Sequence, residues 1–525
     1  MRRVIAAAVV CLALAPSAWL AWRSRDLPHL GYLHDDALYW VSAKSIAEGR
    51  GYRIASLPDE PFETKYPPLY PLLLAGVWRL NPAFPENLPL AALTAWLMAP
   101  LYVAAARLAF LDLGVSRGHA LALCAVVAVN PFLALCGISL LSELPFSVLL
   151  MLALGLIERA RRPQAPWWLA AAAGAVASAA WLTRSVGGLL IVAGPLAFLL
   201  RRQPRRALAF AAAMAPGIAG WLLWRQVHGS PVLDNSASYY TDYLGYYLRT
   251  ASLGDLPIIF WRNLDSLLSS LGGMLVFGLG DGPAGRGLAW VLAAAMLAGT
   301  WRAARQNGLA SHHLFTAAYL GLLVVWNFMP DQRFLLPVYP VLLAGFFSEL
   351  LNLLRRIRSS WHQHALGRVS ALAAWACLAA LALAALWQTG RAFATVLPGF
   401  VGRERAALAG ARPAYEWIRQ RLPPDAAVLA YRDPVLYLYT GRRACRLVIP
   451  PTLLYRGDRG AILRLCASAA DLARAKRLTH ALFTGADFNA ELAGADRAAA
   501  EQAARDDARF SSLYERSGVS VRRLE

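Results

Sequence analysis

Two adjacent carboxylates, Asp35 and Asp36, lie just after the first long apolar stretch of the chain. Neighbouring carboxylates repel one another, so they need a solvated pocket, a cation or a bound proton in order to coexist. An active site supplies such a setting, and one of the pair could act there as a base. The structural alternative is an aspartate cap on a helix that begins near Ala37, where a negative charge is favoured.

Glu143 stands at the start of another apolar stretch, where an ionisable side chain is costly enough to suggest a purpose. It could position an acceptor or share a metal with Asp35, or it could simply accompany a helix cap made by Ser142. The sequence contains no His, Cys and Asp spacing typical of a dedicated metal site, and His34 stands alone beside Asp35. The cofactor is therefore unknown: a divalent metal is possible, but no ligand motif indicates one.

The elements that must position these residues are membrane helices. The chain has 525 residues, 58% hydrophobic and 16% charged, which is too apolar for a soluble protein of that length. A formal net charge of +20 would suggest a nucleic-acid partner in a soluble protein. Here the arginines cluster in short loops between apolar stretches, so we expect no nucleic-acid partner.

Apolar stretches of roughly 17 to 25 residues can cross a bilayer as helices, and about eleven such candidates occur in this chain. They lie at about 4–22, 88–106, 120–137, 144–157, 167–183, 186–200, 207–225, 287–301, 313–329, 334–354 and 369–388. We therefore predict an α-helical polytopic membrane protein. The first stretch also resembles a signal peptide, with a cleavage motif at 15–18, but we expect it to remain as a helix because its removal would unbalance the topology.

The arginines predict one orientation, with a cytoplasmic N-terminus. The loops on the cytoplasmic side would carry Arg2, Arg3, Arg107, Arg117, Arg159, Arg161, Arg162, Arg201, Arg202, Arg205, Arg206, Arg302, Arg305, Arg355, Arg356, Arg358 and Arg368. The opposite short loops carry only Arg184 and Arg333, as the positive-inside rule requires. Two loops at 23–87 and 226–286 and a tail at 390–525 would then face outward, where any extracytoplasmic chemistry must occur.

The chain thus divides into a transmembrane domain at 1–389 and an extracytoplasmic C-terminal domain at 390–525. Strand-like residues at 427–431 and 481–484, with a helical pattern from Ala461 to Leu478 between them, predict a small α/β fold for the tail. Cys445 and Cys466 lie in this tail and could pair in an oxidising compartment, although we expect them to stay unpaired.

Five tyrosines mark the second outer loop, and an apolar run from Leu264 to Leu279 follows them. The tyrosines are Tyr239, Tyr240, Tyr243, Tyr246 and Tyr247. At headgroup depth they could anchor a helix lying on the membrane, which is the interpretation we favour. Alternatively, they could line a groove for a sugar or a prenyl chain.

Several motifs occur in order along the chain. The first outer loop contains Asp35-Asp36-Ala37-Leu38-Tyr39 and Lys65-Tyr66-Pro67-Pro68-Leu69-Tyr70-Pro71. Ser142-Glu143-Leu144-Pro145-Phe146, Leu182-Thr183-Arg184-Ser185-Val186-Gly187 and Arg333-Phe334-Leu335-Leu336-Pro337-Val338-Tyr339-Pro340 follow at outer ends of predicted helices. Over roughly residues 1–390 the chain resembles the GT-C superfamily of membrane glycosyltransferases, and specifically glycosyltransferase family 39, which includes protein O-mannosyltransferases and the lipid A aminoarabinose transferase. Asp36 stands where many relatives have Glu.

The resemblance implies a GT-C fold and an inverting glycosyltransferase that moves a sugar from a polyprenyl-phosphate donor to an acceptor hydroxyl at the outer face of the membrane. The acceptor could be a lipid, a glycan or a protein, and the setting implied is a bacterial cytoplasmic membrane. Asp35 would be the base and Asp36 would orient its surroundings, while Lys65 would bind the donor phosphate. Arg184 and Arg333 could balance the same phosphate, and Glu143 could position the acceptor or a metal.

Other roles stay open for these residues. Lys65 could be an interfacial cation that snorkels towards the headgroups, and each arginine could contact a headgroup or a neighbouring loop. Four tyrosines are expected to line the substrate groove: Tyr39, Tyr66, Tyr70 and Tyr243.

Two other classes of function also fit a polytopic chain, namely a transporter or flippase of lipid-linked sugars and a noncatalytic envelope-assembly protein. Transporters usually show charged or broken helices at the midplane and paired repeats, whereas the charges here cluster at outer helix ends.

Overall fold

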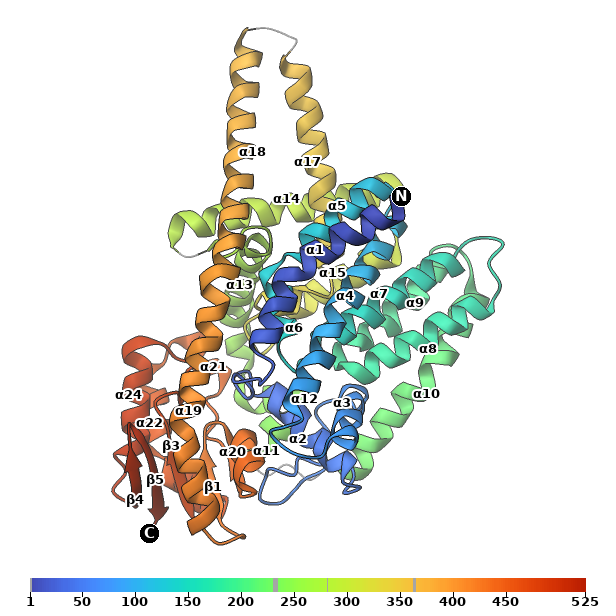
Figure 1. Ribbon diagram of the computed structural model, residues 1–525. Coiled ribbons are helices and arrows are strands. Elements are labelled where there is room, and N and C mark those ends of the chain that lie inside the picture. Colours follow the sequence, from blue (N-terminus) through green and yellow to red (C-terminus); the bar gives the residue numbers. More distant parts are fainter. Residues whose placement is uncertain (1, 230–234, 281, 362–364) are drawn as a thin grey trace.

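The computed structural model describes residues 2–229, 235–280, 282–361 and 365–525. Helices make up the larger part of the molecule, and a mixed sheet with helices of its own forms a smaller C-terminal domain beside the outer loops (Figure 1). The predicted combination of a helical body with a small α/β tail is therefore confirmed.

The described chain before the sheet is built of helices. The first set is α1 (Arg2–Arg23), α2 (Asp35–Ala47), α3 (Leu69–Leu80), α4 (Leu88–Asp112), α5 (Arg117–Ala128), α6 (Pro131–Gly137), α7 (Glu143–Ala160), α8 (Trp168–Thr183), η1 (Ser185–Leu189), α9 (Leu190–Leu199) and α10 (Pro204–His228). The second set is α11 (Asn235–Thr241), α12 (Tyr243–Thr250), η2 (Leu253–Asp255), α13 (Leu256–Leu275), α14 (Pro283–Asn307), α15 (Ser311–Leu323), α16 (Gln332–Leu335), α17 (Tyr339–Trp361), α18 (Ala365–Arg391), the π-helical turn η3 (Ala392–Val396) and α19 (Leu397–Arg421).

Each of the eleven predicted apolar stretches overlaps a helix, but eleven membrane crossings are not confirmed. Among the described residues, four helices are long and apolar enough to span a bilayer: α4, α10, α14 and the continuous helix Arg368–Arg421. The count becomes five if α5 and α6, which meet at a bend of 61°, form one broken span. Several other apolar helices are shorter than a membrane crossing requires. The predicted stretch at 186–200, for example, is divided between η1 and α9.

Close backbone contact holds parts of the helical body together. A Cβ on Gly299 of α14 would lie 2.1 Å from the carbonyl oxygen of Gly345 on α17, so neither position tolerates a side chain. Small residues at such crossings are typical of membrane helices, whose association depends on packing more than on the hydrophobic effect.

The helix Arg368–Arg421 joins the two parts of the molecule. It continues through the predicted domain boundary at 390 without a break. Only 6% of its most apolar stretch is buried inside the protein. Its first part, α18, projects from the body together with α17, whereas its last part, α19, lies along the C-terminal domain (Figure 1).

The C-terminal sheet has five strands in the order β2-β1-β3-β5-β4. The strands are β1 (Ala427–Ala430), β2 (Arg443–Cys445), β3 (His480–Phe483), β4 (Phe510–Arg516) and β5 (Val519–Leu524), and the helices are α20 (Asp433–Thr440), α21 (Pro451–Arg456), α22 (Arg459–Ala467), α23 (Ala469–Ala475) and α24 (Gly494–Arg505). β1 pairs in parallel with β2 and β3, while β5 is antiparallel to β3 and β4. The two predicted strands correspond to β1 and β3, and Cys445 and Cys466 are buried as free thiols.

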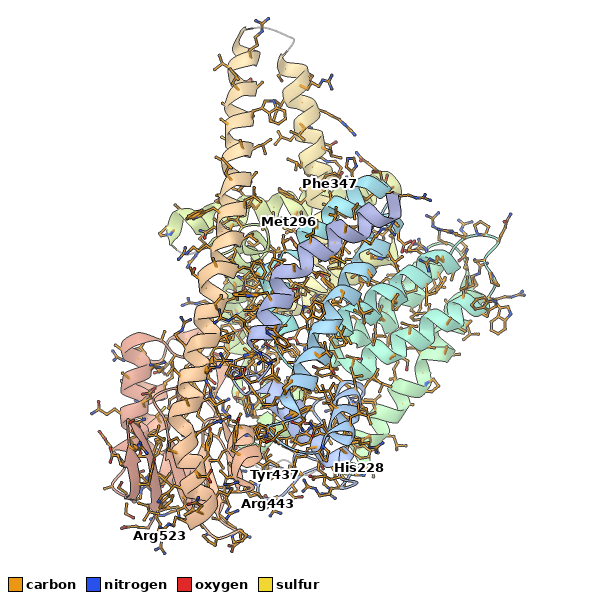
Figure 2. All side chains as sticks on the ribbon, in the orientation of Figure 1. His228, Met296, Phe347, Tyr437, Arg443 and Arg523 are labelled. Atoms are coloured by element: carbon orange, nitrogen blue, oxygen red, sulfur yellow. The ribbon has the colours of Figure 1, made fainter. Side chains whose placement is uncertain are left out.

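The C-terminal domain contacts the loop at 23–87 through β2 and α20. Arg443 donates to the Pro58 carbonyl and pairs with Glu60, and Arg50 donates to the Tyr437 hydroxyl at 3.0 Å. Arg443 and Tyr437 lie close together where the C-terminal domain meets this loop (Figure 2). The domain is therefore packed directly against the segment that contains Asp35 and Lys65.

Candidate active site

The first turn of α2 holds the two predicted carboxylates, but in different environments. Asp36 is 1% exposed and accepts the Gly31 N–H at 3.1 Å and the Ala37 N–H at 2.8 Å. Asp35 keeps part of its surface exposed and accepts the Tyr66 hydroxyl. Neither is the N-cap residue, since His34 occupies that position. Asp36 therefore fixes the loop before α2 through its hydrogen bonds to the backbone, and Asp35 is the carboxylate that remains available for chemistry.

The two carboxylates also differ in pKa. Burial raises the pKa of Asp36 to about 7, against the opposing effect of its backbone hydrogen bonds. Burial would raise the pKa of Asp35 too, but the positive charges of Lys65 and Arg333 and the hydrogen bond from Tyr66 outweigh it, so this pKa lies below its ordinary value. Asp35 is thus the ionised member of the pair at neutral pH.

Lys65 lies in a cage of tyrosines. Its Nζ atom is 4.8, 4.5 and 4.6 Å from the ring centres of Tyr66, Tyr239 and Tyr243, and it donates to the Tyr239 carbonyl at 2.8 Å. The residue is 5% exposed, so it does not snorkel towards solvent. Cation–π contacts hold an ammonium without neutralising it, which leaves two N–H donors for a ligand.

Glu63 fixes the backbone at Lys65 through hydrogen bonds. One carboxylate oxygen accepts the N–H groups of Lys65 and Tyr66 at 2.7 and 3.0 Å, and the other oxygen is buried without a hydrogen-bond partner. Burial raises the pKa of Glu63 and lowers the pKa of Lys65. Sequence reasoning did not select Glu63, because nothing in the motif distinguishes it from a solvated loop glutamate.

The second charged group of the site surrounds Glu143 at the start of α7. Its carboxylate is 3.2 Å from a terminal nitrogen of Arg184 and 3.6 Å from one of Arg333, although neither contact has hydrogen-bond geometry. Ser142 makes no cap; its hydroxyl instead accepts a hydrogen bond from Arg184 at 2.8 Å. The guanidinium groups of Arg184 and Arg333 thus face the carboxylate of Glu143. A second carboxylate, that of Asp331, lies 3.5 Å from Arg333.

Tyr39 joins the two charged groups. Its hydroxyl lies 3.0 Å from the Ser142 hydroxyl, and its ring packs edge-on against Tyr66 and Tyr70, with centres 4.8 and 5.3 Å apart. Tyr243 packs edge-on against Tyr66 at 5.6 Å, so the four predicted groove tyrosines form one aromatic cluster. All ten residues predicted for the site are therefore brought together.

Other residues of the same region were missed by sequence reasoning. Tyr239 and Tyr240 are not the surface anchors that their spacing favours, since Tyr240 is buried in the protein and Tyr239 is half-buried. His34 contacts Tyr239 and Asp433, the latter being 399 residues away in the chain. Adjacency to Asp35 was the only sequence signal for His34, and Asp433 gave none.

A cation site does not emerge from the described geometry. In the parts of the chain that the structure describes, no three His, Cys, Asp or Glu side chains come together as metal ligands.

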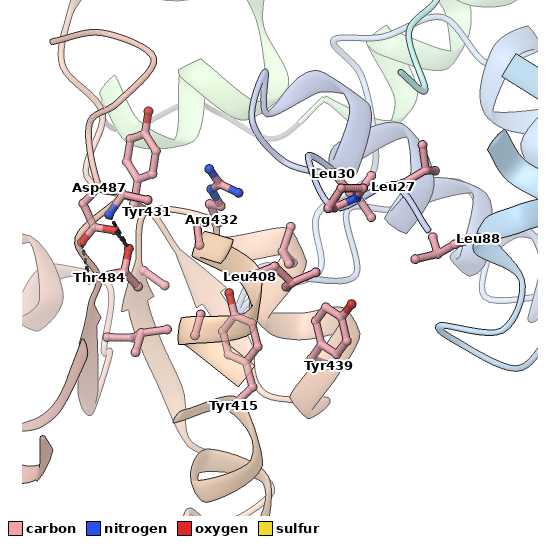
Figure 3. A pocket seen from close by; sticks show the side chains of 17 residues that line it. Leu27, Leu30, Leu88, Leu408, Tyr415, Tyr431, Arg432, Tyr439, Thr484 and Asp487 are labelled. Atoms are coloured by element: carbon pink, nitrogen blue, oxygen red, sulfur yellow. Dashed lines mark hydrogen bonds between the residues drawn. The ribbon is translucent and has the colours of Figure 1, made fainter. Parts of the chain in front are cut away.

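A small pocket of about 30 Å³ adjoins the site (Figure 3). It lies between Leu27 and Leu30 of the first outer loop and Tyr431, Arg432 and Asp487 of the C-terminal domain, and it includes none of the ten predicted site residues. The pocket therefore lies at the contact between the helical body and the C-terminal domain.

Comparisons with known proteins identify solved structures of similar fold. No protein-family model matches the chain, and no curated protein matches it in sequence. Among solved structures, ArnT from Cupriavidus metallidurans bound to undecaprenyl phosphate is similar at a TM-score of 0.50 and 14% identity, over 98% of this chain and 97% of that one. Archaeal oligosaccharyltransferase AglB from Archaeoglobus fulgidus, in complex with an inhibitory peptide and a dolichol-phosphate, is similar at 0.52 and 13%, over 92% and 69%.

Identities this low show the fold alone. The chain therefore has a fold similar to that of ArnT and to that of AglB.

Proposed function

We propose that this chain is an inverting glycosyltransferase that moves a sugar from a polyprenyl-phosphate donor to an acceptor hydroxyl at the outer face of the membrane. The single observation that carries the proposal is the shared use of Tyr66. Its hydroxyl donates to Asp35 while its ring packs under the ammonium of Lys65, so a base and a phosphate-binding cation are held next to each other.

The proposed reaction needs little more than these two groups. The acceptor oxygen attacks the anomeric carbon from the face opposite the donor phosphate, and its proton passes to the Asp35 carboxylate. The bond between the anomeric carbon and the phosphate oxygen breaks, and the lipid phosphate leaves with the electron pair. Attack from the opposite face inverts the anomeric configuration.

Electrostatics favour both halves of this step. A phosphate is a weak base and leaves without being protonated, provided that positive charge receives it, and Lys65 supplies that charge in a dry, tyrosine-lined cage. The lowered pKa of Asp35 keeps it ionised and able to accept a proton. Arg184 and Arg333 add two guanidinium groups near Glu143 and Asp331, and they could assist at the phosphate.

The structural neighbours support the donor class. One is described as bound to undecaprenyl phosphate and the other as bound to a dolichol-phosphate, and both ligands are polyprenyl phosphates. For this chain, the orientation with the active site outside rests on the arginine distribution and is part of the proposal.

The test is incubation of purified full-length protein with a panel of polyprenyl-phosphate sugars and candidate acceptors. We expect release of the lipid phosphate together with a product of inverted anomeric configuration. Asp35→Asn should reduce turnover about 100- to 10,000-fold, the usual contribution of a general base. Asp59→Asn, an exposed carboxylate of the same loop, is the matched control and should retain full turnover.

Two results would contradict the proposal. A wild-type protein that moves intact lipid-linked sugar across proteoliposomes without releasing lipid phosphate would be a flippase. Full transfer by the folded Asp35→Asn variant would remove that residue from the reaction. Repeating the wild-type assay with a chelator determines whether a divalent metal is needed.

A further inference from the structure

Asp433, the first residue of α20, connects the C-terminal domain to the candidate site. Its side chain is fully buried, and one carboxylate oxygen lies 2.9 Å from Nε2 of His34 while the other accepts the Tyr240 hydroxyl at 2.9 Å. Both partners belong to the outer loops of the helical body. A carboxylate is costly to bury unless each oxygen is satisfied, so this contact is built into the fold.

From His34 the contacts continue to Lys65. Because the carboxylate can only accept, Nε2 of His34 carries the proton and its other ring nitrogen, Nδ1, accepts the Tyr239 hydroxyl at 3.0 Å. The backbone carbonyl of Tyr239 accepts a hydrogen bond from Nζ of Lys65, and the Tyr239 ring is one wall of the lysine cage. Asp433 is thus connected to the proposed phosphate-binding lysine by hydrogen bonds through His34 and through the side chain and backbone of Tyr239.

The same contact constrains the residue before Asp35. His34 has a φ of 64°, a backbone conformation that residues other than glycine adopt only when their surroundings enforce it. Nearby, Gly31 has a φ of 84°, and a Cβ there would lie 2.5 Å from a methyl group of Val435 on α20. The loop leading into Asp35 is therefore pressed against α20 at two points.

We propose that Asp433 is a positioning residue for sugar transfer, through which the C-terminal domain fixes His34 and Tyr239 and thereby the cage of Lys65. The inference rests on the proposed function and adds that the extracytoplasmic domain is part of the active site. Asp433 acts through other residues and makes no contact with the reacting atoms.

The experiment compares full-length variants in the transfer assay, with KM for the donor and kcat measured separately. Asp433→Asn and Tyr239→Phe should each raise the donor KM at least five-fold with a smaller change in kcat, since both loosen the wall behind Lys65. Because the two variants break one series of hydrogen bonds, the double variant should be no worse than the weaker-binding single variant. Asp487→Asn is the control: Asp487 is also buried in the C-terminal domain, but it bonds locally to Thr484.

Hydrogen exchange of the backbone amides at 29–40 provides a readout that does not depend on activity. Exchange should be faster in Asp433→Asn than in the wild type and unchanged in Asp487→Asn. Normal exchange at 29–40 in Asp433→Asn, or a wild-type donor KM in that variant, would overturn the inference, as would multiplicative losses in the double variant. Wild-type protein inactive on every donor would instead overturn the proposed function, while faster exchange in Asp433→Asn would still support anchoring of the loop.

Discussion

Replacing Lys65 by Met tests whether its ammonium binds the donor phosphate. Met has a similar length and fills the tyrosine cage, so the change removes the charge with little loss of packing. In the protein Nζ uses one donor on the Tyr239 carbonyl, which leaves two for phosphate oxygens. One hydrogen bond to a charged group contributes about 1.5 to 3 kcal/mol, so the loss of even one of the two should raise the donor KM about 10- to 150-fold.

The assay is initial-rate transfer at varied donor concentration, with size-exclusion chromatography to establish folding. Lys65→Arg should not restore the donor KM, because a planar guanidinium does not fit a cage built around a compact ammonium. Lys44→Met is the matched control, since Lys44 lies in the same outer loop but pairs with Glu48. The reasoning is refuted if Lys65→Met keeps its donor KM within two-fold of wild type while it remains folded.

The same lysine predicts a pH dependence. Burial lowers the pKa of Lys65, although Asp35 and Glu63 oppose the shift, so the ammonium is lost at a lower pH than in an ordinary lysine. Only the protonated form binds phosphate as a cation. The donor KM of the wild type should therefore rise with pH in the alkaline range, and the KM of Lys65→Met should not follow it.

Three further predictions concern stability in detergent, measured by thermal unfolding. With a folded pKa of about 7 against an ordinary 3.8, Asp36 binds a proton more tightly in the folded state, so wild-type stability should fall as pH rises from 4 to 7, and Asp36→Asn should flatten that fall. Gly31→Ala should destabilise the protein by about 1 to 3 kcal/mol, because its φ is positive and its Cβ would meet Val435. Glu143→Gln should cost up to about 3 kcal/mol, since it removes a buried carboxylate that faces the half-buried guanidinium groups of Arg184 and Arg333, whereas Glu416→Gln at an exposed site should cost little.

The parts of the site that the sequence predicts are those set by local spacing and by the side of the membrane. Asp35 and Lys65 belong to one loop, and Glu143, Arg184 and Arg333 lie at helix ends assigned to the same face. Helix ends on one face of a bundle can converge, so the predicted topology is compatible with the proximity that the structure gives these residues. The roles of these residues remain proposals.

Other features depend on tertiary structure that periodicity does not encode. The tyrosines around 239–247 have the spacing of an amphipathic surface helix, yet Tyr240 and Tyr246 are buried and Tyr239 is half-buried. The C-terminal domain contacts Tyr240 through the Arg446 N–H. The contact of Asp433 with His34 joins residues 399 positions apart. The number of crossings was uncertain for another reason: short apolar helices and broken ones have the same composition as complete spans.

The contacts of Asp35 and Lys65 explain why these two charged groups do not form an ion pair with each other. A direct ion pair between Asp35 and Lys65 would lower the basicity of the carboxylate and occupy the ammonium. Instead Asp35 is satisfied by the Tyr66 hydroxyl and Lys65 by the Tyr239 carbonyl, both neutral groups. In the proposed reaction a phosphate binds the ammonium while an acceptor hydroxyl approaches the carboxylate, and Tyr66, which contacts both charged groups, sets the spacing between them. Tyr66→Phe would remove only the hydroxyl, so a fall in kcat with an unchanged donor KM is the result that this arrangement demands.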